Sequence, residues 1–94
     1  MHYDMEKSGA RIQQLRKTQG MTQEQLAAAL SIGDRHLRKI ESGEKGPSID
    51  ILVELSELFD VSLDYIIVGR QPRDNLKKKL SAVIQNLSAL ANEL

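Results

Sequence analysis

The segment from Met21 to Gly43 constrains the fold most, because it predicts two short helices separated by a tight turn at Ser31-Ile32-Gly33. Thr22 and Gln25 have the spacing of a capping box, in which the side chain of each residue bonds the backbone N–H of the other. The second helix has two inward apolar residues and a charged outer face: Leu37 and Ile40 against Asp34, Arg35, His36, Arg38 and Lys39. Such a helix is anchored from behind and presents polar groups in front.

Three more helices are predicted around this segment, so we expect an all-α fold. Ile12 and Leu15 face inward on the first helix. Serines are expected to begin these helices and glycines to end two of them: Ser8 and Gly20 for residues 8–19, Ser48 for the fourth helix, Ser62 and Gly69 for the fifth. Residues 8–69 would then form one five-helix domain.

The last segment, residues 73–94, predicts a C-terminal amphipathic helix. Its apolar residues recur at spacings of four, three, four, three and four, which is a heptad stripe: Leu76, Leu80, Val83, Leu87, Leu90 and Leu94. Ile84 and Ala91 widen the stripe on one side. We expect a dimerisation helix that also leans on the fifth helix. Two alternatives stay open, namely packing against its own domain or against another protein.

The charges are unevenly distributed although the net charge is zero. Residues 1–46 sum to +2, residues 47–69 to −5 and residues 70–94 to +3. An anionic partner would therefore meet one side of the molecule and avoid the middle segment. The chain has no cysteine, and neither His2 nor His36 has a second ligand at metal-binding spacing, so we expect no metal and no cofactor. The sequence shows no Ser-His-acid arrangement, phosphate loop or paired-carboxylate cleft, so we expect no catalytic role.

Residues Gly9 to Gly69 resemble the helix-turn-helix domain of the lambdoid phage repressor and Cro family. The resemblance covers about two-thirds of the chain and rests on these matches: Gly9 to Ile12, Leu15-Arg16, Thr22 to Glu24, Leu26-Ala27, Ile40-Glu41, Gly43, Pro47-Ser48 and Val61 to Tyr65. It implies that the helix after the turn enters the major groove of double-stranded DNA. Ser31 departs from the pattern, because the family has glycine at this left-handed position, and a non-glycine residue there costs about 1–2 kcal/mol.

The residues of the outer face divide by chemistry. Arg35 or Arg38 is expected to bond guanine O6 and N7, a contact that discriminates by about 1–3 kcal/mol. Asp34 would accept from cytosine or orient Arg38. Phosphate contacts are expected from Lys39 and, by resemblance, from Gln23 and Lys45. Gly33 and His36 complete the expected DNA-binding set, Arg11 and Lys17 are possible flanking contacts, and by resemblance Arg16 and Glu41 form an internal ion pair.

These features predict a sequence-specific DNA-binding regulator, a repressor acting as a homodimer on a palindromic operator. The alternative is a protein-interaction module, such as an antitoxin or a partner-binding regulator, that uses its C-terminal helix. No apolar run approaches the ~18 residues of a membrane span, and the first residues lack the order of a signal peptide. We therefore expect a cytoplasmic, nucleoid-associated protein of bacterial or phage type.

Overall fold

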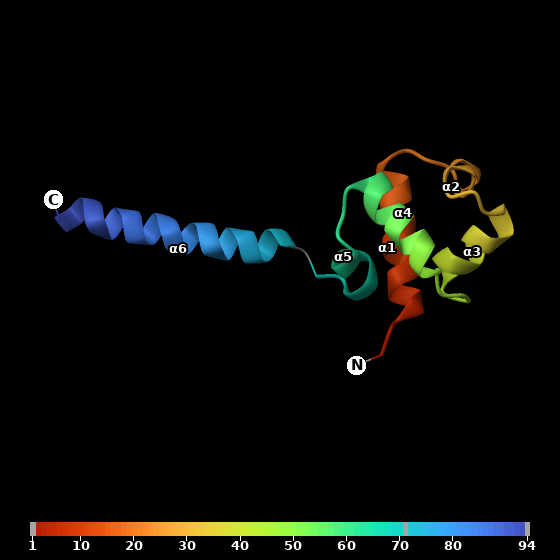
Figure 1. The fold of residues 1–94 in the computed structure, drawn as a ribbon, viewed down its shortest axis with the longest axis horizontal. Coiled ribbons are helices and arrows are strands. Elements are labelled where there is room, and N and C mark those ends of the chain that lie inside the picture. The colour runs from red at the N-terminus through yellow and green to blue at the C-terminus, as the bar shows by residue number, and fades with distance from the viewer. Residues whose placement is uncertain (1, 71, 94) are drawn as a thin grey trace.

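The computed structural model describes the backbone of residues 2–70 and 72–93 and the side chains of residues 2–70 and 79–92. The described backbone is helical and contains no strand, which confirms the all-α prediction. The helices are α1 (Met5–Thr18), α2 (Gln23–Ala29), α3 (Asp34–Ser42), α4 (Ile49–Phe59), α5 (Leu63–Val68) and α6 (Pro72–Glu93). Figure 1 shows α1 to α5 gathered into one body, from which α6 leads away.

Helices α1 to α5 share one apolar core. Its buried members are Ile12, Leu26, Ala27, Leu30, Leu37, Ile40, Ile51, Leu52, Leu55, Phe59 and Ile66. Each large side chain buried in this way contributes about 1.5–3 kcal/mol relative to an exposed one. Helix α2 is anchored in this core by Leu26 and Ala27, and Leu30 follows directly after it. Helix α3 is anchored by Leu37 and Ile40, as predicted.

Side-chain caps begin three of the helices where the sequence predicts them. The Thr22 hydroxyl accepts from the backbone N–H of Gln25 at 3.1 Å, and the Gln25 side chain accepts from the N–H of Thr22 at 2.9 Å. Ser48 and Ser62 cap α4 and α5 by accepting from the N–H three residues on. The capping box and both serine caps are therefore confirmed.

The predicted start of the first helix is wrong. Helix α1 begins three residues earlier, capped by Asp4, whose side chain accepts from the N–H of Lys7 at 3.0 Å. Ser8 is instead fully buried: its hydroxyl donates to the carbonyl of Ile66 at 2.9 Å and accepts from the Tyr3 hydroxyl at 2.8 Å. Because the bond to Ile66 joins residues 58 positions apart, Ser8 fastens α1 to α5 and does not act as a cap.

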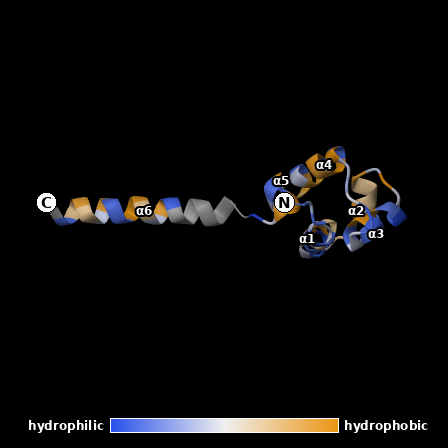
Figure 2. Cartoon of the chain, turned by 90° about the horizontal axis from the view of Figure 1, so that it is seen from below, coloured by the Kyte–Doolittle hydropathy of each residue, from blue (hydrophilic) through white to orange (hydrophobic). Residues whose placement is uncertain are grey.

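The apolar stripe of α6 is uncovered over the side chains that are described. Leu80, Val83, Ile84, Leu87 and Leu90 are between 52% and 61% exposed, and Figure 2 shows their hydrophobic positions recurring along the helix. The expected contact with the fifth helix is therefore wrong for residues 79–92, and so is packing back on the domain. The predictions for Leu76 and Leu94 lie outside the described side chains. Among the described residues, no helix is both long and apolar enough to cross a membrane.

Candidate nucleic-acid interface

The turn between α2 and α3 contains the left-handed residue that the family resemblance implies. Ser31 lies in the left-handed region at φ +56°, the conformation expected where related chains have glycine. The N–H of Ile32 donates to the carbonyl of Ala27 at 3.0 Å and closes the turn. Gly33 then begins α3 from an extended backbone, without a side-chain cap. This short connection fixes the direction in which α3 leaves α2.

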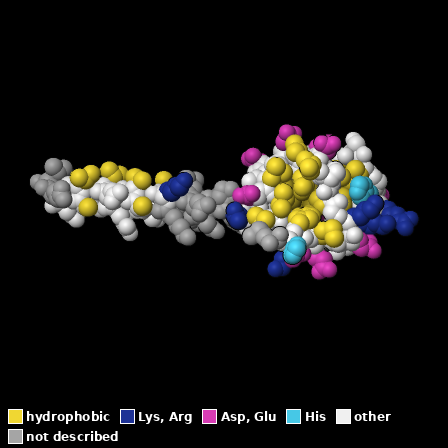
Figure 3. All heavy atoms as spheres, turned by 60° about the horizontal axis from the view of Figure 1, so that its bottom comes forward, with side chains coloured by type: hydrophobic (Ala, Val, Ile, Leu, Met, Phe, Trp, Pro, Cys, Tyr) yellow, Lys and Arg dark blue, Asp and Glu magenta, His cyan; other side chains and the backbone are white. Residues whose placement is uncertain are grey.

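Helix α3 has a buried back and a polar front. Leu37 and Ile40 are fully buried, whereas Arg35 and Arg38 are exposed. Half-buried side chains border the front, namely Asp34, His36 and Lys39. Figure 3 shows Lys and Arg side chains together with a histidine at the end of the domain remote from α6, the end at which Figure 1 places α3. The exposed arginines thus stand on a helix whose back is fixed in the core.

A buried ion pair ties α1 to α3. Arg16 Nε lies 2.7 Å from Glu41 Oε2, and Arg16 Nη2 donates to Glu41 Oε1 at 3.1 Å. Arg16 Nη1 also donates to the carbonyl of Met21 at 2.9 Å, just before α2. Both side chains are almost completely buried, at 9% and 2% exposure. The ion pair expected from the resemblance is present, and Arg16 thereby joins α1 to α3 and to the segment before α2.

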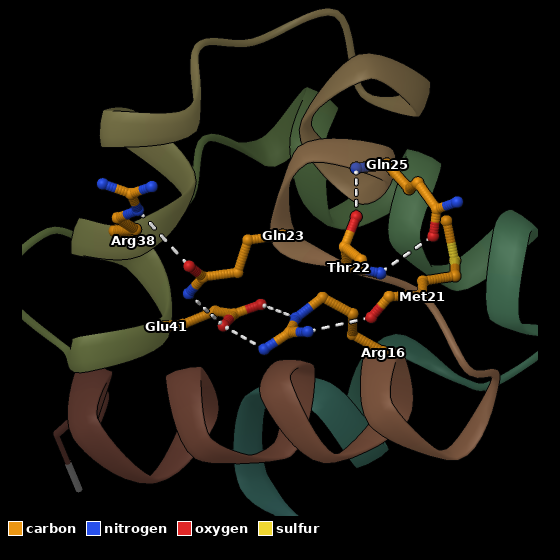
Figure 4. Close-up of polar contacts among 7 residues, drawn as sticks. All are labelled: Arg16, Met21, Thr22, Gln23, Gln25, Arg38 and Glu41. Atoms are coloured by element: carbon orange, nitrogen blue, oxygen red, sulfur yellow. Dashed lines mark hydrogen bonds and ion pairs between the residues drawn. The ribbon is translucent and has the colours of Figure 1, made fainter.

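Gln23 extends this network to the exposed face. Its side chain amide donates to Glu41 Oε1 at 3.0 Å, and its Oε1 accepts from Arg38 Nε at 3.3 Å. Figure 4 shows the resulting chain of contacts from Arg16 through Glu41 and Gln23 to Arg38. The sequence predicts only a phosphate contact for Gln23. Asp34, considered as the residue that orients Arg38, makes no hydrogen bond with it among the described residues, whereas Gln23 does.

Helices α1 and α3 approach so closely that only glycine fits between them. A Cβ at Gly9 would lie 2.3 Å from the carbonyl oxygen of Ile40 and 2.7 Å from that of Glu41. Gly9 matches the family in sequence, but the match alone indicates no role for it. Its role is to seat the last turn of α3 directly on α1, beside the buried ion pair.

The flanking basic residues are not equivalent. Lys17 and Lys45 are exposed, as a phosphate contact requires. Arg11, proposed as a possible flanking contact, instead donates through Nη1 to the carbonyls of Ile66 and Ile67 at 3.1 and 3.4 Å. These carbonyls belong to the last turn of α5, where a cation is favourable. Arg11 therefore stabilises the end of α5, a role that the sequence does not indicate. The described residues contain no group of three or more side chains suited to a metal ion.

Comparison with known proteins identifies the family. The model of the helix-turn-helix family matches residues 12–66, which is more than half of the chain. The chain belongs to the helix-turn-helix family. The transcriptional regulator ImmR of Bacillus subtilis is 33% identical to this helix-turn-helix chain over 84 residues, covering 84% of the chain and 66% of ImmR. The regulator YobD of the same organism is 44% identical over 57 residues, covering 61% of the chain and 51% of YobD. The chain thus spans between half and two-thirds of the length of these two relatives.

A solved structure confirms the repressor-like fold. The P22 c2 repressor in complex with a synthetic operator superposes with a TM-score of 0.63 at 27% identity, covering 67% of this chain and 96% of the other. The helix-turn-helix region of this chain is therefore a DNA-binding domain of the transcriptional-regulator type.

Proposed function

We propose that the protein is a repressor that binds a palindromic DNA operator as a homodimer, with α3 of each protomer in the major groove. The observation that carries this proposal is the arrangement of α3. Two exposed arginines project from a helix that is held by the core, by the Arg16–Glu41 ion pair and by close contact with Gly9. A recognition helix must be held in this way, because base readout depends on placing a guanidinium within hydrogen-bond distance of a base edge.

In this proposal the polar residues divide into those that contact base edges and those that contact the DNA backbone. Arg35 and Arg38 read base edges, and Asp34 accepts from a cytosine amino group. Phosphate is bound by Lys39, Lys45 and the N-terminus of α2 at Gln23. At the start of α3, Gly33 and His36 lie beside the DNA backbone. Phosphate contacts release counterions, so affinity is expected to fall steeply with salt. A protein that acts on operator DNA would work in the cytoplasm, beside the nucleoid.

The homodimer is proposed to form through α6. Its described stripe is exposed, and residues 80–92 contain no charged side chain, so two copies meet without like-charge repulsion. The heptad spacing suits pairing with an identical helix. The stripe includes Leu76, Leu80, Val83, Ile84, Leu87, Leu90 and Leu94. Two-fold symmetry then requires half-sites about one helical turn, or 34–36 Å, apart.

The test of DNA readout starts with selection of bound sequences from random DNA, followed by binding to the selected operator. We expect Arg35→Ala combined with Arg38→Ala to abolish specific binding without changing the helical content. The matched control is Arg70→Ala with Lys79→Ala, which removes the same charge from exposed positions remote from α3. Unchanged operator affinity in the α3 variant would refute the assignment. Reduced transcription from a reporter promoter that overlaps the operator would support repression.

The test of dimerisation is sedimentation of the full chain. Leu87→Lys places a charge in the stripe and is expected to give a monomer with weaker operator affinity. Ser88→Lys adds the same charge to the polar face and should remain a dimer. The exposed stripe equally favours a second candidate, an antitoxin-like regulator that binds a different protein through α6. A wild-type monomer that associates one-to-one with such a partner would support that candidate and overturn the homodimer.

A further inference from the structure

The side chain of Gln23 links Arg38, an exposed arginine of α3, to the buried carboxylate of Glu41. Gln23 is half-buried at the start of α2, and both ends of its amide bond protein groups. Its orientation is fixed by chemistry: the Glu41 carboxylate only accepts, and the Arg38 guanidinium only donates. A flipped amide would place oxygen against carboxylate and N–H against N–H. Gln23 therefore offers Arg38 an acceptor in one defined place.

The Glu41 end of this link is held by several hydrogen bonds. Glu41 Oε1 receives both Gln23 Nε2 and Arg16 Nη2, while Glu41 Oε2 receives Arg16 Nε. Arg16 is in turn bonded to the carbonyl of Met21. No described side-chain nitrogen or oxygen that is buried lacks a partner. A satisfied, buried ion pair thus anchors the side chain that holds Arg38 (Figure 4).

The bond to Gln23 uses the part of Arg38 that base readout does not need. Its donor is Nε, and among the described residues Nη1 and Nη2 make no hydrogen bond. The two terminal nitrogens together present a fork that suits guanine O6 and N7. Holding Nε restricts a long, exposed side chain before DNA arrives, so less conformational entropy remains to be lost on binding.

We propose that Gln23 is a positioning residue that sets the base preference of Arg38, in addition to any phosphate contact it makes. The second N–H of its amide is not used in the described contacts, so a phosphate bond is compatible with this role. The proposal rests on the proposed function, because it assumes that Arg38 reads a base. It differs from a phosphate role in one measurable respect: a positioning residue changes discrimination at one base pair, whereas a phosphate ligand changes affinity for all sequences alike.

The experiment is a double-mutant cycle on the selected operator and its single-base variants. Arg38→Ala first identifies the base pair that Arg38 reads. Gln23→Met keeps the length of the side chain but removes both hydrogen bonds, and is expected to reduce discrimination at that base pair by about threefold to tenfold, the equivalent of one hydrogen bond. In the Arg38→Ala background it should cause no further loss there. Arg35→Ala is the control. When it is combined with Gln23→Met, the fold-losses of the two substitutions should multiply, as for independent sites.

The outcomes separate this proposal from the proposed function. If Arg38→Ala changes one base preference and Gln23→Met lowers affinity equally for every operator variant, only the positioning role is overturned. If Arg38→Ala changes no base preference, the readout and the positioning role both fail. A DNA-free measurement guards against a folding defect: the NMR resonance of Arg38 Nε should shift in Gln23→Met, while that of Arg35 Nε stays in place. An unmoved Arg38 resonance in the folded variant would overturn the proposal.

Discussion

The contact between α1 and α3 at Gly9 gives the sharpest prediction of stability. In Gly9→Ala, the new Cβ would lie 2.3 Å from the Ile40 oxygen and 2.7 Å from the Glu41 oxygen, so the first distance must grow by at least 0.7 Å to reach 3.0 Å. Both oxygens belong to the backbone, and a change of rotamer cannot move them away. Helix α3 must therefore shift as a body, together with Glu41 and the exposed arginines.

The cost follows from two opposing effects. Overpacking of a filled core costs about 1–3 kcal/mol, and sometimes more. Alanine is about 1 kcal/mol more favourable than glycine inside a helix, which offsets part of the cost. Because the contacts are backbone atoms, we expect the upper end of the overpacking range and a net loss of about 2 kcal/mol. For a domain of this size, this lowers Tm by roughly 8–16 °C.

The assay is urea and thermal unfolding of the full chain, paired with operator binding. The matched control is Gly46→Ala, whose Cβ would meet its nearest neighbour, the Met5 sulfur, at an ordinary 3.4 Å. This control is expected to keep or slightly raise stability, because alanine restricts the unfolded chain. Gly9→Ala should also weaken operator binding, since α3 is displaced. Wild-type stability in Gly9→Ala would refute the close approach of the two helices.

Three further predictions concern the ion pair, the turn and the end of α5. Glu41→Leu alone should cost about 3–5 kcal/mol in urea unfolding, because it leaves Arg16 buried without its partner; adding Arg16→Met should restore most of this, and additive losses would contradict the pairing. Ser31→Gly should raise Tm by several degrees, since it relieves a left-handed strain of about 1–2 kcal/mol; an unchanged or lower Tm would argue against that conformation. Arg11→Met should lower stability by about 1 kcal/mol through the lost bonds to α5. It should leave the ratio of specific to non-specific DNA affinity unchanged, and a changed ratio would indicate that Arg11 contacts DNA.

The sequence predicted the parts of the fold that depend on near neighbours. Thr22 and Gln25 form the capping box, and Ser48 and Ser62 cap their helices. Each of these features is set within about four residues, where the geometry of one turn decides which groups meet. Ser8 shows the limit of such reasoning. It has the character of a cap, yet its hydroxyl bonds a carbonyl 58 residues away.

The sequence by itself determined that this chain is all-α, where the two helices of the motif lie, and that α3 has an apolar back and a basic front. Only the tertiary structure decided what Gly9, Arg11 and Gln23 do. Gly9 admits the backbone of α3, Arg11 bonds the end of α5, and Gln23 joins Arg38 to the buried pair. Periodicity specifies which face of a helix is buried, but it carries no information on which atoms of another helix arrive there. That depends on packing between segments that are remote in the chain.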